Sequence, residues 1–358
     1  MNPERPLLSF AIPTYNFGKF IGDTVRSIED GLRVLSCQQI EIVILDGGSR
    51  DDTDTVVADL VQIYGNIRYI KNAERGGIDR DLDSVSRMTN GQYTWLFSAD
   101  DLLDPAWDET IVPILTLMPD IVLAPARLCD VNMKPLRQNP IFKVSSDSTA
   151  LDVTLAGDEQ SLTHYLEQSN TLEALFSYMS AVIVRTDHWK SNRSRTDYFG
   201  TCWAHCAALI PQLLAGAKVI YTGRSLIQKR GGNDSFMENG LVARIGIAVY
   251  GWNRIIGEFF PVRLHREILF ARLRNDISIA LFLYAKINSR DRDEVARLDA
   301  MAKLLLAGEV RAFKPTLHYC AYRLFPSSPP IAAVVRRMLP ALIRVRHRMR
   351  ERRELRSQ

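Results

Sequence analysis

The sequence predicts an α/β fold: a mostly parallel central sheet flanked by helices, followed by a helical extension. In the first hundred residues, short apolar runs alternate with segments whose apolar residues have helical spacing. From about residue 236 onwards the spacing is helical to the end of the chain. Alternation of this kind predicts parallel strands joined by helices, with ligands bound at the carboxyl ends of the strands. We expect one domain over residues 1–235 and a helical extension over residues 236–358.

Each expected strand is a short apolar run closed by polar, glycine or proline residues. The strands are expected at Leu7–Ile12, Ile40–Leu45, Ile67–Ile70, Tyr93–Phe97, Ile121–Pro125, Ala181–Val184 and Lys218–Tyr221. The helices of the first domain are expected at 18–35, Thr53–Tyr64, Asp81–Thr89 and Ala204–Ala215, with Asp51 and Asp52 where the second of them would be capped. Residues 130–160 are polar and rich in loops. The extension carries candidate helices at 240–259, 263–287, 291–307 and 331–352.

The composition is that of an ordinary globular protein. Of the 358 residues, 46% are apolar and 24% charged, which excludes disordered, collagen-like and disulfide-scaffold classes. The longest apolar runs fall well short of the ~18 residues that a membrane-spanning helix requires, and the first residues lack the pattern of a secretion signal. The five cysteines are scattered and odd in number, which favours a reducing compartment. We therefore expect a cytoplasmic protein.

Positive charge is concentrated at the end of the chain. Residues 311–358 hold twelve Lys or Arg against two acids, so they carry +10 and the preceding residues −6. Within them, residues 331–349 place apolar side chains at helical spacing between arginines, with Pro340 expected to kink the helix. A basic amphipathic helix favours docking on an anionic membrane surface. Packing on the enzyme body and an oligomer contact are the alternatives. Nucleic acid is disfavoured because no aromatic residue follows Phe325.

Polar side chains follow three of the expected strands at the point where each ends. Thr14, Tyr15 and Asn16 follow the first strand, Asp46 the second, and Asp100 the fourth together with Asp101. Any one such loop is explained by turn and cap chemistry alone. Three of them at consecutive strand ends favour a ligand site.

The acidic residues at these ends suggest what the site binds. Asp100 and Asp101 suit Mg²⁺ or Mn²⁺, which take one or two carboxylates plus substrate phosphates; alternatively Asp101 caps a following helix that starts at Leu102 or Pro105. Asp46 suits a base N–H or a ribose hydroxyl. Neither a Gly-Lys-Ser/Thr phosphate loop nor a GxGxxG fingerprint is present, so a dinucleotide cofactor is disfavoured.

Three motifs together resemble the successive signatures of family 2 glycosyltransferases, which have the GT-A nucleotide-sugar-binding fold. They are Ala11-Ile12-Pro13-Thr14-Tyr15-Asn16, Ile44-Leu45-Asp46-Gly47-Gly48-Ser49-Arg50-Asp51 and Trp95-Leu96-Phe97-Ser98-Ala99-Asp100-Asp101. Two further segments, Phe176–Trp189 and residues 230–236 (RGGNDSF), resemble the abequosyltransferase-like branch, which adds dideoxyhexoses to bacterial O-antigen.

The resemblance implies a donor site and a divalent metal, Mn²⁺ or Mg²⁺, on Asp100. Thr14 and Asp46 would hold the base and ribose, Asn16 and Ser49 would support the loop, and Arg80 would lie against the diphosphate. The donor-site residues that it implies are Pro13, Thr14, Tyr15, Asn16, Asp46, Gly48, Ser49, Arg80, Ser98, Ala99 and Asp100. Ser98 stands where the family has the first Asp of its Asp-x-Asp triplet, so metal binding would be weaker, would lean on Asp101, or would depend on substrate phosphates.

The family's catalytic Glu-Asp pair is replaced by Thr201-Cys202-Trp203-Ala204-His205-Cys206. His205 falls at the Asp position, and a neutral imidazole is a competent base. A core histidine and a zinc ligand with Cys202 and Cys206 are the alternatives, and the fallback bases are Asp197, Asp158 and Asp187. The residues expected near the acceptor or sugar are Asp101, Trp203, Arg230, Asn233 and Asp234, although a plain surface turn would also explain the last three.

The sequence thus predicts an inverting transferase that moves a sugar, such as a dideoxyhexose, from a nucleotide-diphosphate sugar to a glycan acceptor. A polyprenyl-diphosphate-linked acceptor would place the protein at the inner face of the cell membrane, and a homo-oligomer is compatible with the sequence. Transfer of an ordinary hexose and a catalytically silent nucleotide-sugar-binding protein are the alternatives. A nucleotidyltransferase is disfavoured because Pro13-Thr14-Tyr15-Asn16 is not a glycine-rich basic loop.

Overall fold

The computed structural model describes residues 5–143, 150–307, 319, 320, 322 and 323. It divides into two compact units, Met1–Asp234 and Ser235–Gln358. The basic amphipathic segment expected at 331–349 lies outside the described residues. Among the helices that are described, none combines the length and the apolar character needed to cross a membrane.

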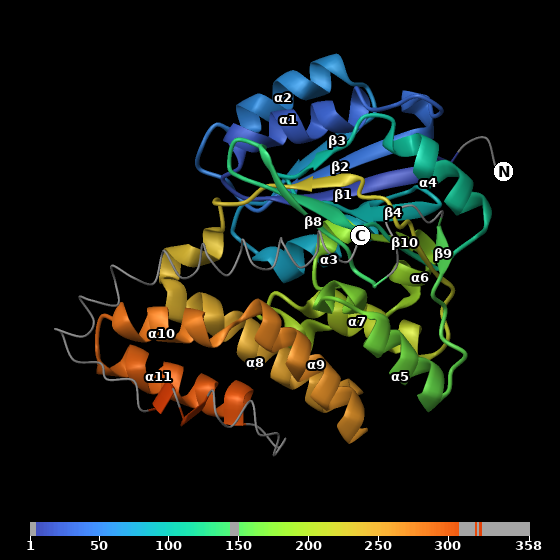
Figure 1. Ribbon diagram of the computed structural model, residues 1–358. Helices are drawn as coiled ribbons and strands as arrows, with labels where there is room; N and C mark the ends of the chain where they lie inside the picture. Colours follow the sequence, from blue (N-terminus) through green and yellow to red (C-terminus); the bar gives the residue numbers. More distant parts are fainter. Residues whose placement is uncertain (1–4, 144–149, 308–318, 321, 324–358) are drawn as a thin grey trace. The chain divides into compact units, whose positions relative to one another are not determined.

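The first unit is built on a mixed sheet of eight strands (Figure 1). Their order across the sheet is β3 (Ile67–Lys71), β2 (Ile40–Asp46), β1 (Leu8–Thr14), β4 (Tyr93–Leu96), β10 (Val182–Arg185), β6 (Ile121–Leu123), β11 (Val219–Tyr221) and β9 (Leu151–Asp152). The pairs among β3, β2, β1 and β4 are parallel, whereas β10 is antiparallel to both of its neighbours. The carboxyl ends of four consecutive strands therefore meet at one edge, as the alternation predicted.

A second, four-stranded sheet has the order β5 (Leu102–Leu103), β12 (Ile227–Lys229), β7 (Ala126–Cys129) and β8 (Pro135–Asn139). Strand β12 pairs with β5 and thereby brings the chain after residue 229 back to the segment that follows Asp100 and Asp101. This pairing corrects one expectation. Asp101 caps no helix, because Leu102 enters a strand and the next helix starts only at Trp107, after Ala106 as its N-cap.

Helices cover both faces of the eight-stranded sheet. Figure 1 shows α1 and α2 side by side on one face and α3 on the other, and α3 contacts β1, β2, α6 and α7. The helices of this unit are α1 (Gly18–Glu29), α2 (Thr53–Ile63), α3 (Ile78–Met88), α4 (Trp107–Thr116), α5 (Glu159–Gln168), α6 (Thr186–Ser191) and α7 (Ala204–Leu214).

Helix α1 is shorter than the pattern over 18–35 predicted. A β-carbon at Gly31 would lie only 2.6 Å from the Trp107 ring, so the chain leaves the helix where it passes this side chain. One carboxylate oxygen of Asp108 then accepts the backbone N–H groups of Arg33, Val34 and Leu35. The apolar positions Leu32 and Leu35 fit a helix, but a tertiary contact ends it first.

Aromatic side chains fill the core beneath the strand ends. Phe10, Trp95, Phe97 and Trp107 are fully buried, and the rings of Phe10 and Trp95 stack at 5.3 Å. Because a buried indole N–H needs an acceptor, Trp95 donates to the Ser180 carbonyl at 2.7 Å and Trp107 to the Ile28 carbonyl at 3.1 Å. This packing fixes β1 and β4 relative to each other and so fixes the loops that follow them.

The second unit is helical: α8 (Leu241–Phe259), α9 (Arg263–Asp276), α10 (Ile279–Ile287) and α11 (Arg292–Ala302), followed by a π-helical turn over Lys303–Ala307. The single helix expected over 263–287 is two helices, since the chain breaks at Ile277 and Ser278. Asp291 caps α11 by accepting the backbone N–H of Glu294 at 2.8 Å.

Candidate active site

The loops after β1 and β2 form one hydrogen-bonded body. Gly47 donates its N–H to the Thr14 carbonyl at 2.8 Å, and Asn16 donates its N–H to the Ser49 hydroxyl at 2.8 Å. In return, the Asn16 side-chain oxygen accepts the N–H of Arg50 at 2.9 Å. Asn16 has a φ of 56°, a left-handed conformation that asparagine tolerates better than most residues. The predicted residues of these two loops are therefore adjacent in the structure.

Asp46 lies at the carboxyl end of β2 and is fully buried. One of its carboxylate oxygens accepts the Ser49 N–H and the other the Tyr69 hydroxyl, both at 2.7 Å. Burial, together with this bond to a carboxylate, raises the pKa of Tyr69 well above its usual range. Asp46 therefore holds the loop and β3 together.

Thr14 and Tyr15 stand beside this carboxylate. Thr14 is 4% exposed, and its hydroxyl oxygen is buried without a hydrogen-bond partner. The ring of Tyr15 is half-buried and lies 4.1 Å from the Arg75 guanidinium, close enough for a cation–π contact. Pro13 is buried at the end of β1, and Gly48 has a φ of 82°, which only glycine adopts easily.

The first turn of α3 adds a carboxylate that the sequence reasoning missed. Asp81 is 4% exposed, and its carboxylate lies between two glycines: a β-carbon at Gly47 would be 2.7 Å from one oxygen, and a β-carbon at Gly76 2.4 Å from the other. Burial raises the pKa of Asp81 to about 6, against the opposing effect of Arg80 and Arg75. Its Oδ1 atom is buried and has no hydrogen-bond partner.

Asp100 follows β4 and lies at the surface of a small polar cluster. Its carboxylate accepts the Ser98 hydroxyl on one oxygen and the Asn233 side-chain amide on the other. The Asp100 carbonyl accepts the Nε–H of Arg230 at 2.9 Å. The structure thus brings together four residues that the sequence predicted from segments more than 120 positions apart. Ala99, between them, is buried.

Arg230 is itself nine-tenths buried, with its guanidinium 4.6 Å from the Phe20 ring. Nη1 donates to the Val131 carbonyl at 2.8 Å, but Nη2 is buried without a partner. Asp234, five residues beyond β12 in the same loop, is exposed. This loop is therefore anchored to Asp100 and is more than a plain surface turn.

Asp101 points away from Asp100 and into the protein. It is 2% exposed, and its oxygens accept the Tyr178 hydroxyl, the Ser180 hydroxyl at 2.7 Å and the Arg230 N–H at 3.1 Å. Burial and the neighbouring Asp100 charge raise the pKa of Asp101 to about 7. The expectation that Asp101 contacts the acceptor or shares the metal is corrected, because these bonds turn it inward.

The residues around Asp100 fit a divalent cation that shares its coordination with substrate. Mg²⁺ is commonly held by one or two carboxylates plus phosphate oxygens, and here Asp100 and the Ser98 hydroxyl supply oxygen donors, while Asn233 turns its amide N–H to Asp100. Among the described residues there is no group of three or more His, Cys, Asp or Glu side chains that would hold a metal without substrate. Cys202, His205 and Cys206, the zinc alternative, do not form such a group in the described part of the chain.

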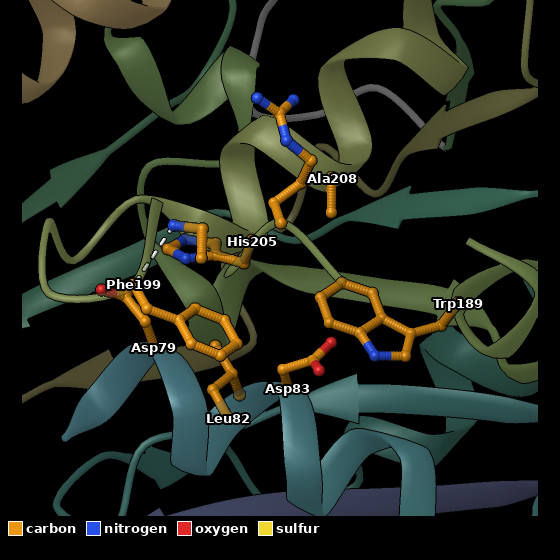
Figure 2. Close-up of a pocket in the computed structure, with 9 residues that line it drawn as sticks. Asp79, Leu82, Asp83, Trp189, Phe199, His205 and Ala208 are labelled. Atoms are coloured by element: carbon orange, nitrogen blue, oxygen red, sulfur yellow. Dashed lines mark hydrogen bonds between the residues drawn. The ribbon is translucent and has the colours of Figure 1, made fainter. Parts of the chain in front are cut away.

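His205 lies in the first turn of α7 and lines a small pocket (Figure 2) with room for about one water molecule. The side chains of Asp79, Leu82, Asp83, Trp189, Arg195 and Phe199 share this pocket. His205 is 8% exposed, with Nε2 at 3.0 Å from the Phe176 carbonyl. Burial lowers its pKa, with Asp79 opposing, so the ring is neutral at pH 7.

Asp79 determines where α7 begins. Its two carboxylate oxygens accept the N–H groups of Cys202 at 2.8 Å and Ala204 at 3.1 Å. A carboxylate at the N-terminus of a helix accepts N–H groups that have no partner within the helix, and its negative charge interacts favourably with the positive end of the helix dipole. Trp203, just before the helix, is half-buried. Arg80, adjacent to Asp79, is exposed, with its guanidinium 5.9 Å from the Phe199 ring.

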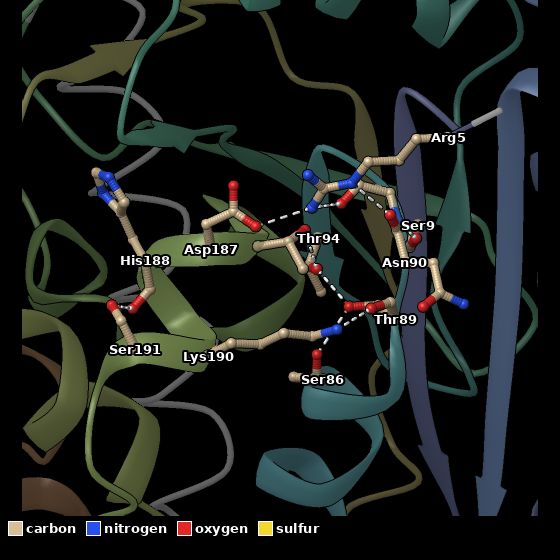
Figure 3. Close-up of polar contacts among 12 residues, drawn as sticks. Arg5, Ser9, Ser86, Thr89, Asn90, Thr94, Asp187, His188, Lys190 and Ser191 are labelled. Atoms are coloured by element: carbon tan, nitrogen blue, oxygen red, sulfur yellow. Dashed lines mark hydrogen bonds and ion pairs between the residues drawn. The ribbon is translucent and has the colours of Figure 1, made fainter. Parts of the chain in front are cut away.

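One of the fallback bases is excluded by its position, and the other two are held in contacts of their own. Asp187 follows β10, which runs antiparallel to β4 with Arg185 opposite Tyr93, so it lies at the amino end of β4, whereas Asp100 follows the carboxyl end. There it pairs with Arg5 at 3.0 Å (Figure 3). Asp158 caps α5 by accepting the Ser161 N–H at 2.7 Å. The third, Asp197, forms a two-point ion pair with Arg195, at 3.0 and 2.9 Å.

Comparison with known proteins agrees with this layout. Residues 9–175 match the model of the family described as glycosyl transferase family 2. The chain carries a family 2 glycosyltransferase domain. It is 25% identical to the abequosyltransferase RfbV of Salmonella typhimurium over 270 residues, which span 74% of this chain and 78% of that protein.

Two solved structures show that this glycosyltransferase has the GT-A fold. S. aureus TarS 1-349 in complex with UDP-GlcNAc matches with a TM-score of 0.57 and 14% identity, over 83% of this chain and 81% of that one. The mannosyltransferase PcManGT from Pyrobaculum calidifontis, in complex with GDP-Man and Mn²⁺, matches with a TM-score of 0.51 and 13% identity, over 95% of this chain and 86% of that one.

Proposed function

We propose that this glycosyltransferase transfers a dideoxyhexose, with inversion, from a nucleotide-diphosphate sugar to a hydroxyl of a lipid-linked glycan in bacterial surface polysaccharide synthesis. The observation that carries the proposal is the gathering of hydroxyl, amide and carboxylate groups at the carboxyl ends of β1, β2 and β4. The similarity to an abequosyltransferase supports the choice of sugar. The donors named for TarS and PcManGT, UDP-GlcNAc and GDP-Man, support a nucleotide-sugar.

We assign donor binding to the two loops and to the Asp100 cluster. Thr14 and Tyr15 would take the nucleoside at the loops that the buried Asp46 holds together, and Arg80 would lie against the diphosphate. The buried Nη2 atom of Arg230 has no partner, so a phosphate oxygen or a sugar hydroxyl would satisfy it. Asp101 we assign to positioning, since its bonds hold Arg230 and the Asp100 loop in place.

A divalent cation, held by Asp100 and by the donor's phosphates, would offset the negative charge that grows on the leaving diphosphate. This chain's own part is to present one carboxylate with a hydroxyl and an amide beside it. Because Ser98 supplies a neutral oxygen donor, the affinity for the cation without nucleotide should be weak.

We assign proton removal from the acceptor hydroxyl to His205. In the neutral tautomer whose Nε2–H donates to the Phe176 carbonyl, Nδ1 carries the lone pair that accepts the proton. A pKa below the ordinary value keeps this lone pair available at pH 7, and the nearby Asp79 carboxylate stabilises the imidazolium that forms. General-base catalysis of this kind contributes about 10²–10⁴-fold to the rate.

The test measures donor binding and transfer separately. Purified protein is offered CDP-, GDP-, UDP- and dTDP-sugars with Mn²⁺, and release of the nucleoside diphosphate is followed with and without acceptor glycan. His205→Gln should keep donor affinity and lose at least 100-fold in transfer rate, and Asp100→Ala should lose the metal dependence of binding. Asp187→Asn, at the other end of the sheet, is the control and should behave as wild type.

The same assay can contradict the proposal. A protein that binds donors but releases no nucleoside diphosphate would be a silent nucleotide-sugar-binding protein. Transfer of an ordinary hexose would correct the sugar, and a product with the donor's anomeric configuration by NMR would exclude inversion. A His205→Gln variant with wild-type turnover would remove His205 from catalysis.

For location, we propose that the protein works at the inner face of the cell membrane, held by its basic end. Support comes from the net charge of +10 over residues 311–358. Full-length protein should cosediment with vesicles that contain anionic lipid, and 0.5 M NaCl should release it. Replacement of the arginines at 344, 346, 348 and 350 by glutamine should weaken this binding, and unchanged cosedimentation would refute the role of the charge.

A further inference from the structure

Two buried polar atoms next to the loops after β1 and β2 have no hydrogen-bond partner in the part of the chain that the structure describes. They are the Thr14 hydroxyl oxygen and the Oδ1 atom of Asp81. Both residues are only 4% exposed. A buried acceptor or hydroxyl that stays unsatisfied costs free energy, so such atoms are rare in native structures and call for an explanation.

The two side chains belong to one small region. Gly47 connects them: its N–H bonds to the Thr14 carbonyl, and a β-carbon on it would lie 2.7 Å from Asp81 Oδ2 and 3.6 Å from the Thr14 carbonyl oxygen. Gly76 approaches the other carboxylate oxygen of Asp81 just as closely. Two residues without side chains thus make room for this carboxylate, which a larger side chain at either position would displace.

Asp46, the carboxylate that the family resemblance assigns to the nucleoside, is already engaged. Each of its oxygens accepts a hydrogen bond at 2.7 Å from within the protein, one from Ser49 and one from Tyr69. Asp81 differs in that its buried Oδ1 atom accepts no hydrogen bond of ordinary geometry, although Arg75, Arg80 and the Gly77 N–H lie near enough to favour its charged form. Of the two carboxylates, Asp81 has the unused acceptor.

We propose that Asp81 accepts an N–H of the donor's nucleobase and, with the Thr14 hydroxyl, determines which base is bound. This inference rests on the proposed function, because it takes the ligand to be a nucleotide-sugar. A carboxylate oxygen accepts from a ring N–H or an exocyclic amino group, and a threonine hydroxyl donates to a ring carbonyl or a ring nitrogen. Buried groups of this type discriminate strongly between bases, because a base that leaves them without a hydrogen bond binds more weakly.

The experiment compares equilibrium binding of UDP, CDP, GDP and dTDP to the full chain by calorimetry. Wild-type protein should prefer one base by tenfold or more. Asp81→Ala should weaken binding of that nucleotide at least tenfold and bring the four affinities to within about threefold of one another. Asp81→Asn, which keeps the shape of the side chain, should also lose the preference.

The control is Asp54→Asn, which neutralises another acid in the first turn of a helix, one paired with Lys71 on the exposed side of α2. It should keep both the affinity and the order of preference. Wild-type protein that binds none of the four nucleotides would refute the proposed function. Wild-type binding with the same order of preference in both Asp81 variants would refute the role of Asp81 alone.

Discussion

Replacing Asp81 by asparagine should stabilise the protein at neutral pH, although we expect it to weaken donor binding. The pKa of Asp81 rises from its ordinary value of 3.8 to about 6 because the carboxylate is buried, with Asp46 adding repulsion and Arg80 and Arg75 opposing. One pKa unit corresponds to 1.36 kcal/mol, so keeping Asp81 ionised costs the native state about 3 kcal/mol above pH 7.

The sign and the pH window follow from linkage. Between about pH 4 and pH 6 the native state binds more protons at Asp81 than the unfolded chain does, so this residue lowers stability as the pH rises. An asparagine side chain does not titrate in this range, so the Asp81→Asn variant lacks this contribution to the pH dependence of stability. The stability advantage of Asp81→Asn over wild type should therefore grow by roughly 2 kcal/mol between pH 4 and pH 7.5.

Thermal unfolding at the two pH values provides the assay. For a domain of this size, 1 kcal/mol moves Tm by roughly 2–4 °C, so the difference in Tm between variant and wild type should increase by about 4–8 °C. Titrations of other groups are common to both proteins and cancel in this comparison. An advantage that is the same at both pH values, or a variant less stable at pH 7.5, would refute the assignment of a destabilised carboxylate.

Three further substitutions test the contacts around the site. Asp79→Ala should cost about 1–2 kcal/mol of stability in urea unfolding, because it leaves the first N–H groups of α7 unpaired. It should also lower the pKa of His205 further, which NMR can follow. An unchanged His205 pKa would refute the coupling between the two side chains. Tyr178→Phe should cost about 1–3 kcal/mol because Asp101 keeps its burial but loses a donor, and denaturant melts that overlay wild type would contradict this. Gly76→Ala should destabilise the protein by about 1–3 kcal/mol, because the new methyl group clashes with Asp81. Adding Asp81→Ala should restore most of the lost stability. Strictly additive effects of the two substitutions would show that the two side chains do not meet.

The sequence is sufficient to place the strands and the loops that follow them, since both depend on local patterns. Apolar runs such as Ile40–Leu45 can only be buried strands here, and the polar residues after them must then lie at one edge of a parallel sheet. The contact between Asn16 and Ser49 follows from that logic. For Asn233 the sequence predicted only a place near the donor sugar or the acceptor, and its bond to Asp100 is a finding of the structure.

Features that depend on the direction of a side chain are not readable from the sequence. Asp100 and Asp101 look equivalent as neighbours, but only the first lies at the surface of the site, and Tyr178 and Ser180 hold the second inside. Asp81 resembles any acid in the first turn of a helix, where the helix dipole favours negative charge. Its environment depends on two glycines, Gly47 in the loop after β2 and Gly76 just before α3. The pair Gly76-Gly77 just before α3 is the one signal that could have drawn attention to it.

The close fit of Asp81 between Gly47 and Gly76 also limits how this protein can diverge. A methyl group at either glycine would need the space that the carboxylate occupies, so neither position can change first without loss. Substitutions at the three sites should therefore arise together during evolution. Homologues that carry a side chain at the position of Gly47 or Gly76 should have alanine, serine or glycine in place of Asp81 and, with that exchange, a different choice of substrate.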